Sequence, residues 1–184
     1  YYCDANSACG ESCAEIDIQR ASQFAWHSTL HTAKDHTGFG GQGGGYDWNG
    51  PRAWSASKYS PGSKCIDTAR PFQVAASFPV GANGTLRAVE VRLTQDGGEC
   101  ALALHLKGYE GMAELSAALA QGMTPVVSYR SSSDSLLMNG AVLAPCTSES
   151  AGTCRDSVKF YDISVEDLPQ QEAAEAKAPE AEQA

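Results

Sequence analysis

The sequence has little positive charge, and it has no hydrophobic run long enough to span a membrane. Its 13 Lys and Arg residues are outnumbered by 22 Asp and Glu residues, which gives a formal net charge of −9. Binding to nucleic acid depends on a basic patch that neutralises phosphates, so this balance argues against a nucleic-acid partner. We also expect no membrane partner. No signal peptide is visible, and the first residues, YYCDAN, resemble the inside of a domain, so we expect a mature form or a fragment.

The seven cysteines contain no C-x-x-C pair, the spacing typical of zinc and redox sites. They are spread through a chain rich in loops, which favours disulfides formed in an oxidising compartment. The odd count leaves one cysteine unpaired, or paired to a segment outside this chain. The sequon NGT at Asn83 is typical of an exposed, glycosylated loop. Together these features predict a secreted protein, and nothing in the sequence calls for a cofactor.

Eighteen Gly and eight Pro residues separate short apolar runs, a pattern typical of many strands and turns. The segment GMAELSAALAQG at 111–122 is the one clear helix, and Gly122 ends it. We expect strands within 13–33, 66–79, 86–95, 100–107, 124–130, 135–143 and 156–165. Many strands with one short helix predict an all-β, antiparallel sandwich.

We assign residues 1–168 to this sandwich domain and residues 169–184 to an acidic tail. The tail has no aromatic or large aliphatic residue, so we expect it to be disordered and to be a candidate contact for another protein. Residues 35–64 form a long excursion rich in Gly and aromatic residues, and a loop of this length is usually functional or disordered. Its side chains Trp48, Trp54 and Tyr59 either stack on sugar rings or pin the loop to the body of the domain.

The segment CAEIDIQRASQ at 13–23 places two carboxylates, Glu15 and Asp17, on one face of a strand. Retaining glycosidases pair a nucleophilic carboxylate with an acid/base carboxylate about 5–5.5 Å away. A strand motif E-x-D-x-x-E brings its last residue onto the same face only where a bulge inserts one residue. That residue is Arg20, whose guanidinium stays protonated and cannot act as the acid/base.

Two interpretations of this acidic strand stay open. With a bulge, Arg20 holds Glu15 ionised or binds a sugar hydroxyl. Without one, Gln19 shares the face of Glu15 and Asp17, and Arg20 points away. A solvated cluster of salt bridges on an exposed strand is the alternative to a functional site. A zinc site formed by the three nearby histidines lacks an obvious fourth ligand, so we expect no metal.

Six blocks follow one another along the chain: EIDIQRAS, HSTLH, DWNGPR, YSPG, IDTARPFQVAASF and QGMTPVVSYRSS. In this order and spacing they resemble the second half of glycoside hydrolase family 7, the retaining β-1,4-glucanases that include cellobiohydrolases and endoglucanases. The resemblance extends over residues 1–165. It implies a concanavalin-like β-jelly-roll of curved antiparallel sheets, incomplete because the family's first half is missing, with a cellulose chain lying along the concave face.

The resemblance also implies roles for individual residues. Glu15 falls on the nucleophile and Asp17 on its hydrogen-bonding partner. His31 falls on the active-site histidine, although a satisfied strand histidine is the simpler alternative, and Arg52 falls on an arginine that contacts sugar. We add Trp48, Tyr59 and Arg130 as substrate-binding candidates.

The departures from the family pattern concern catalysis and sugar stacking. Arg20 stands where the family has its acid/base Glu, and Gln19 stands where it has Trp. Arg130 and Leu137 occupy the positions of two tryptophan platforms. These replacements predict a glucanase whose catalysis is weakened or lost.

Three functions therefore follow from the sequence. The first is a secreted glucanase of reduced activity, with Asp17 or His31 as substitute proton donor. The second is a non-catalytic protein that binds β-1,4-glucan or a related polysaccharide and uses Arg20 and Arg130 for sugar hydroxyls. The third is a structural or interaction role that involves the acidic tail.

Overall fold

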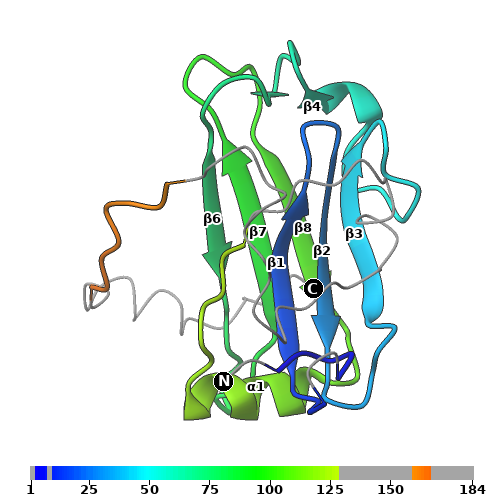
Figure 1. The fold of residues 1–184 in the computed structure, drawn as a ribbon, viewed down its shortest axis with the longest axis vertical. Helices are drawn as coiled ribbons and strands as arrows, with labels where there is room; N and C mark the ends of the chain where they lie inside the picture. The colour runs from blue at the N-terminus through cyan, green and yellow to red at the C-terminus, as the bar shows by residue number, and fades with distance from the viewer. Residues whose placement is uncertain (1–2, 8–9, 129–158, 167–184) are drawn as a thin grey trace, which may run out of the picture.

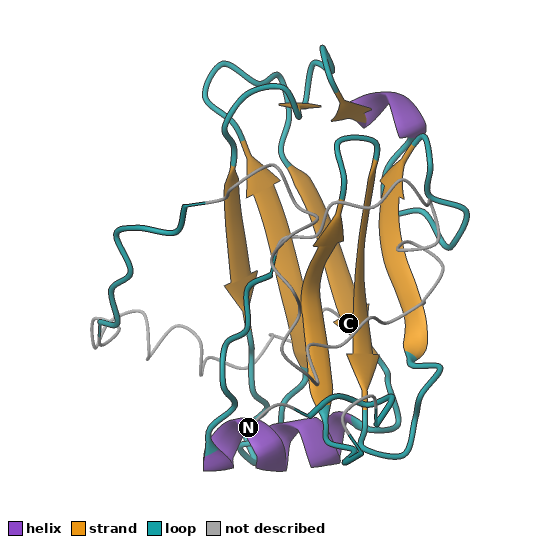
Figure 2. Cartoon of the chain, viewed as in Figure 1, coloured by secondary structure: helices purple, strands orange, loops and turns teal. Residues whose placement is uncertain are grey.

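The computed structural model describes residues 3–7, 10–128 and 159–166. Two three-stranded antiparallel sheets face each other, and one helix lies across their lower end in this view (Figure 1). Colouring by secondary structure shows that strands greatly outnumber helices in the described chain (Figure 2). The molecule is thus an all-β sandwich with one short helix, as the sequence predicts.

The first sheet has the order β1-β2-β3, with β1 at Glu15–Ala21, β2 at Ala25–His31 and β3 at Phe39–Gly45. Strand β2 is the central strand of this sheet and is buried along its whole length. One face carries Trp26 and Leu30 into the interior between the sheets. The other face carries histidines and belongs to the candidate site described below.

The second sheet has the order β6-β7-β8, with β6 at Gln73–Ser77, β7 at Ala88–Thr94 and β8 at Leu102–Lys107. Strand β8 alternates strictly between buried and exposed residues, the period of two that puts one face on a core. At the upper end, the short helix η1 at Ala56–Lys58 leads into β4 at Tyr59–Ser60, which pairs in parallel with β5 at Ile66–Asp67.

The core lies between the two sheets and combines Trp26 and Leu30 of the first sheet with Tyr59 of β4 and aliphatic residues of the second sheet. Burying one such side chain contributes about 1.5–3 kcal/mol of transfer free energy, so this layer carries most of the stabilisation. Ile16 and Ile18 of β1 pack against it, as their alternation with Glu15 and Asp17 predicts. Its central members are Trp26, Leu30, Tyr59, Val89, Val91, Leu93, Leu102, Leu104 and Leu106.

The helix α1 at Met112–Gln121 ties the two sheets together at one end. Its Glu114 carboxylate accepts the backbone N–H of Ala33, just after β2, at 2.7 Å. Its Ser116 hydroxyl accepts the backbone N–H of Leu86, just before β7, at 3.0 Å. Gly122 ends the helix with φ +98°, a conformation that glycine adopts without strain.

Two disulfides lie within the described residues, Cys3–Cys13 and Cys65–Cys100. They confirm the prediction of disulfides and point to an oxidising compartment. The single described helix of ten residues, α1, is not the long apolar kind that crosses a membrane, and the described chain contains no other candidate.

Most of the expected elements are present, and three expectations are wrong. Residues 124–128 and 159–165, the described parts of two expected strands, have no regular secondary structure. The excursion 35–64 is not a loop throughout, because it contains the strand β3. The expected strand at 135–143, Arg130, Leu137 and the tail 169–184 lie outside the described residues.

Candidate functional site

A β-bulge in β1 organises the site. Asp17 pairs with Thr29 and Arg20 pairs with His27, so one extra residue of β1 lies between these two pairs. The extra residue turns Arg20 to the face that carries Glu15 and Asp17, while Gln19 is exposed to solvent. The Ser28 hydroxyl donates a hydrogen bond of 2.5 Å to the carbonyl of Ile18 inside the bulge. The bulge is therefore present, and Arg20 lies on the face of the two carboxylates. The expectation that Arg20 holds Glu15 ionised is wrong, because its guanidinium pairs with Asp17 and the pKa of Glu15 is raised.

Strand β2 supplies the central row of the site. His27, Thr29 and His31 alternate with Trp26 and Leu30, so the polar three face away from the core. All three are buried, because β1 lies along one side of them and β3 along the other.

Strand β3, with the sequence FGGQGGG, lies beside this row almost without side chains. A Cβ added to Gly41 would lie 2.8 Å from Thr29 Oγ1 and 3.1 Å from His27 Cδ2. A Cβ added to Gly38, whose φ is +75°, would lie 2.4 Å from His31 Cε1. Glycine therefore keeps open the space above the histidines, and it lets the strands approach closely.

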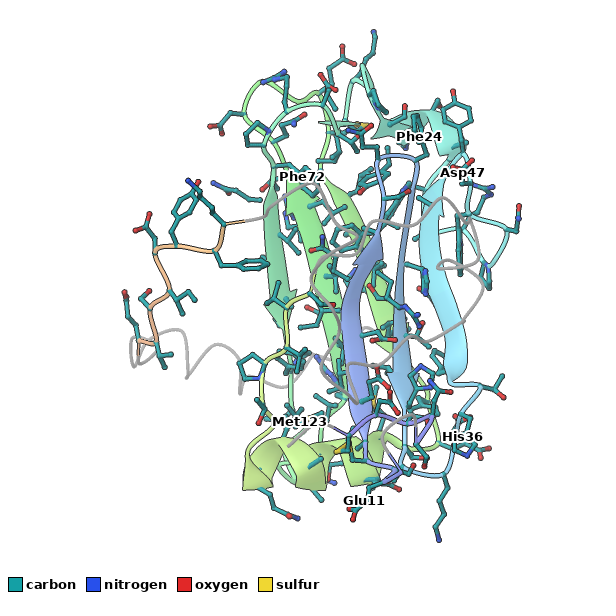
Figure 3. All side chains as sticks on the ribbon, in the orientation of Figure 1. Glu11, Phe24, His36, Asp47, Phe72 and Met123 are labelled. Carbon is teal, nitrogen blue, oxygen red and sulfur yellow. A yellow bond between two sulfur atoms is a disulfide. The ribbon has the colours of Figure 1, made fainter. Side chains whose placement is uncertain are left out.

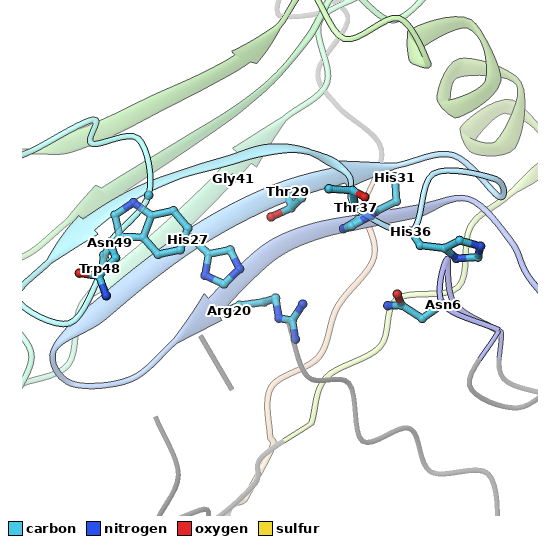
Figure 4. A pocket seen from close by; sticks show the side chains of 11 residues that line it. Asn6, Arg20, His27, Thr29, His31, His36, Thr37, Gly41, Trp48 and Asn49 are labelled. Atoms are coloured by element: carbon cyan, nitrogen blue, oxygen red, sulfur yellow. The ribbon is translucent and has the colours of Figure 1, made fainter. Parts of the chain in front are cut away.

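The result is a groove of about 370 Å³ on the outer face of the first sheet. Trp48 and His27 lie at one end, His36 and Asn6 at the other, with His31 between them (Figure 4). Figure 4 also shows the guanidinium of Arg20 and the ring of His27 pointing into the same opening.

The carboxylates Glu15 and Asp17 lie next to the groove without lining it within the described chain. Glu15 Oε2 accepts the backbone N–H of Ala5 at 3.0 Å. Asp17 Oδ2 lies 3.5 Å from Arg20 Nη1 and 3.7 Å from His31 Nε2. Glu15 is thus engaged by the backbone, whereas Asp17 Oδ2 lies within ion-pair distance of two cationic groups and accepts no hydrogen bond within the described structure.

The two carboxyls differ in their affinity for protons. Burial, and second the nearby charge of Asp17, raise the pKa of Glu15 to about 7. Burial also opposes the ionisation of Asp17, but the contact with His31 and the positive charge of Arg20 outweigh it and hold the pKa of Asp17 below its ordinary value. Near neutral pH, Asp17 is ionised while Glu15 carries a proton for part of the time.

The two histidines of β2 also differ. Burial works against the charged form of His31, but contact with Asp17 and with the carbonyl of Asp35 raises its pKa above the ordinary value. The Nδ1–H of His31 donates to that carbonyl at 3.0 Å, since a carbonyl can only accept. Burial, assisted by the charge of Arg20, lowers the pKa of His27 to about 4, so this ring is neutral near pH 7.

Among Trp48, Tyr59 and Arg52, the substrate-binding candidates within the described chain, only Trp48 lines the groove. Trp48 stacks on His27 with ring centroids 4.7 Å apart and an interplanar angle of 13°, and it is only 8% exposed. Its indole N–H donates to the carbonyl of Pro51 at 2.9 Å. Trp48 therefore forms a wall of the groove and offers little ring face to a sugar.

Tyr59 and Arg52 do not reach the groove. Tyr59 is 2% exposed, packs among Trp26 and Phe72, and donates its hydroxyl to the carbonyl of Ser22 at 3.0 Å. Arg52 donates to the carbonyl of Gly45 at 2.5 Å and to that of Trp48, which fixes the loop after β3. Sugar stacking by Tyr59 is a correction to the sequence interpretation, because both faces of its ring are covered by the core.

Two further aromatic residues of the excursion, Trp54 and Tyr46, differ in their exposure, and Trp54 follows the alternative in which it pins the loop to the domain. Trp54 is buried against β3 and Tyr59. Tyr46, which the sequence interpretation did not select, is 59% exposed. It follows the last residue of β3 and precedes Asp47, which lies with Phe24 at the opposite end of the molecule from His36 (Figure 3).

His27, His36, Thr29 and Asn6 also line the groove, and the sequence interpretation gave them no binding role. The alternation of His27 with His31 is the signal that places both histidines on one face. No comparable signal exists for Asn6, which comes from the N-terminal segment. Within the part of the chain that the structure describes, no group of three or more His, Cys, Asp or Glu is arranged to hold a metal ion.

Comparison with known proteins gives no family assignment, since no protein family, curated protein or solved structure matches the chain.

Proposed function

We propose that the chain is a secreted, glycan-binding protein on a glycosidase-type sandwich, with a β-1,4-glucan or a related polysaccharide as partner and with hydrolysis weakened or lost. The observation that carries this proposal is the composition of the groove. Among the described residues that line it there is no Asp or Glu, although glycosidases act through carboxylates that face the substrate.

The position of Arg20 supports the same proposal. The bulge brings Arg20 to the place where an E-x-D-x-x-E motif would present its acid/base. A guanidinium neither donates its proton near neutral pH nor accepts one, and the loss of a general acid lowers rates by about 10²–10⁴. Arg20 is suited to bind an oxygen of a sugar and unsuited to cleave the bond.

A second candidate is slow hydrolysis by Glu15 and Asp17. Their pKa values are pushed apart, with Glu15 raised to about 7 and Asp17 lowered. Such a separation is typical of a carboxyl pair that divides the roles of acid and base. This activity requires a movement that exposes Glu15, because its carboxylate is bonded to the backbone of Ala5.

Secretion is supported by the two disulfides. It is also supported by the sequon at Asn83, which lies exposed in a turn where the carbonyl of Thr85 accepts the N–H of Gly81 at 2.8 Å.

The experiment that tests the proposal has two readouts on one protein preparation. Calorimetric titration with cellohexaose measures binding, and a time course of product release from the same oligosaccharide measures hydrolysis. The variants are Arg20→Ala, Glu15→Gln and, as a matched control, Arg92→Ala, which removes an exposed arginine of β7 in the other sheet.

Binding without turnover, weakened by Arg20→Ala and unchanged by Arg92→Ala, is the expected result. Turnover that disappears in Glu15→Gln would establish the second candidate instead. A chain that binds neither cellohexaose nor a charged oligosaccharide of the same length would overturn the assignment of the groove to glycans.

A further inference from the structure

The charge of the groove is opposite to the charge of the chain. The chain carries a formal net charge of −9, yet the charged or ionisable side chains that line the groove among the described residues are one arginine and three histidines. His31 leans toward the imidazolium form because Asp17 and the carbonyl of Asp35 contact it. The carboxylate of Asp17, next to the groove, offsets part of this positive charge through its ion pair with Arg20. Low-dielectric walls strengthen the field of the charge that remains.

Arg20 has unused hydrogen-bonding capacity at this opening. Its side chain is 23% exposed. Within the described residues it pairs with Asp17, through Nη1 at 3.5 Å from Oδ2. A guanidinium has five N–H donors in a planar fork, which fits two oxygens of one carboxylate or sulfate. The groove face of this fork is therefore available to a ligand.

His27 adds a second, independent indication of a polar ligand. It is 5% exposed, and its Nδ1 atom has no hydrogen-bond partner within the described structure. The stacking on Trp48 holds the ring in place beside Arg20 (Figure 4). A buried polar atom without a partner costs free energy, and a ligand atom that pairs with it recovers that loss.

We propose that the groove binds a glycan that carries anionic groups, carboxylate or sulfate, with Arg20 as the residue that pairs with the anion and His27 as its hydrogen-bonding neighbour. This inference rests on the proposed function and names its ligand class. A neutral sugar laid over Arg20 would displace water from the charge and accept its N–H groups only through uncharged hydroxyl oxygens. An anionic group adds the attraction of an opposite charge and can accept two N–H groups of the planar fork at once.

Matched probes test this inference. Cellohexaose and its C6-oxidised counterpart, a β-1,4-linked glucuronate hexamer, have the same backbone and differ in the carboxylates. A sulfated cellohexaose forms the third arm and distinguishes the two anionic groups. We expect at least one anionic hexamer to bind about tenfold or more tightly than cellohexaose at low salt, a gain in line with one charge-assisted hydrogen bond.

The preference for anionic hexamers over cellohexaose should decrease in 1 M NaCl, because salt screens the charges. It should be lost in Arg20→Gln, while Arg20→Lys should keep part of it. Arg92→Gln should leave the preference unchanged. His27→Gln should weaken every hexamer that binds.

The inference is overturned if cellohexaose binds as tightly as both anionic hexamers, or if Arg20→Gln leaves their advantage intact. In the first case the groove still binds glycans, so the proposed function stands. If none of the three hexamers binds, the proposed function and this inference fall together. Circular dichroism of each variant checks that the sandwich has folded.

Discussion

The guanidinium of Arg20 lies 3.5 Å from the carboxylate of Asp17, because a bulge in β1 turns both side chains to one face of the sheet. The pair places a permanent positive charge next to the ring of His27. Arg20 thus has two effects on its surroundings: it favours the ionised form of Asp17, and it disfavours the charged form of His27.

Replacing Arg20 by Gln should raise the pKa values of both Asp17 and His27. The nearby positive charge lowers both values, so its removal makes protonation easier at each group. An NMR titration that follows the imidazole C–H signals of His27 measures the change. Arg92→Gln is the control. An unchanged titration of His27 in Arg20→Gln would show that burial alone sets its pKa.

The variant His27→Gln should change how stability depends on pH. His27 has an ordinary pKa of 6.5 and a folded pKa of about 4, so between these values the unfolded chain binds the extra proton. Its contribution is fully present above pH 6.5 and is lost as the pH falls to 4, by up to about 3 kcal/mol.

This dependence is measured as the difference in unfolding free energy between the natural chain and His27→Gln, in urea, at several pH values. Glu15 has the opposite effect, because its raised pKa makes stability fall between pH 4.5 and about 7. The contribution of Glu15 cancels in the difference between the two unfolding free energies, since Glu15 is present in both the natural chain and His27→Gln. A difference that does not vary from pH 4 to 6.5 would contradict the burial of a neutral His27.

Tyr59 should behave as a core residue and not as a sugar platform. Tyr59→Ala should cost about 3–5 kcal/mol of unfolding free energy, because it removes a fully packed ring. Tyr59→Phe should cost only about 1 kcal/mol, for the hydrogen bond to Ser22, and should leave glycan affinity unchanged. Thermal unfolding and calorimetric titration of Tyr59→Phe separate these roles. Loss of glycan affinity in a Tyr59→Phe variant that remains stably folded would show that Tyr59 takes part in binding.

The disulfide between Cys65 and Cys100 should contribute about 3–4 kcal/mol, the chain-entropy value for closing a loop of about 35 residues. The double variant Cys65→Ala/Cys100→Ala should therefore unfold at a lower urea concentration. The slope of its unfolding free energy against urea concentration should be similar to that of the natural chain. The same replacement at Cys3 and Cys13, which close a loop of 10 residues, should cost less. Equal losses at both sites would indicate that loop length does not decide the effect.

Asn83 should carry an N-linked glycan when the chain is produced through a secretory pathway. The side chain is exposed, and its carbonyl accepts the backbone N–H of Thr85 at 3.1 Å, so the sequon lies in an accessible turn. Enzymatic deglycosylation should lower the mass of the natural chain and leave that of Asn83→Gln unchanged. A Thr85→Ala variant should lose the glycan as well.

The sequence predicts the sandwich well because its signals are local. Alternation of Ile16 and Ile18 with carboxylates identifies β1, and the run at 102–107 alternates as β8 does in the structure. The helix is recognised from its apolar face and its terminal Gly122. These patterns depend on neighbours in the chain and need no knowledge of the rest of the fold.

The site is predicted only in part because its key features depend on distant segments. The bulge carries no glycine and no other local mark, so the sequence leaves the direction of Arg20 open. The sequence interpretation assigns β3 to a loop because glycine is disfavoured in strands. In the structure, the pairing of β3 with β2 requires glycine at these positions. Tyr59 is a core residue and not a sugar platform because Trp26 and Phe72 pack against its ring. The sequence does not reveal that these two residues lie beside Tyr59.

The glycines of β3 restrict how the groove can change through substitution. A Cβ at Gly43 would lie 1.8 Å from the carbonyl oxygen of Trp26, and one at Gly44 would lie 2.3 Å from the ring of Trp54. Strand β3 thus tolerates no added side chain at these two positions, whatever ligand is favoured. Gly41, which lines the groove, is constrained in the same way, since a Cβ there would lie 2.8 Å from Thr29 Oγ1. A descendant of this sequence would acquire a new specificity more easily on β1, on the histidine row of β2 or on the loop around Trp48 than on β3.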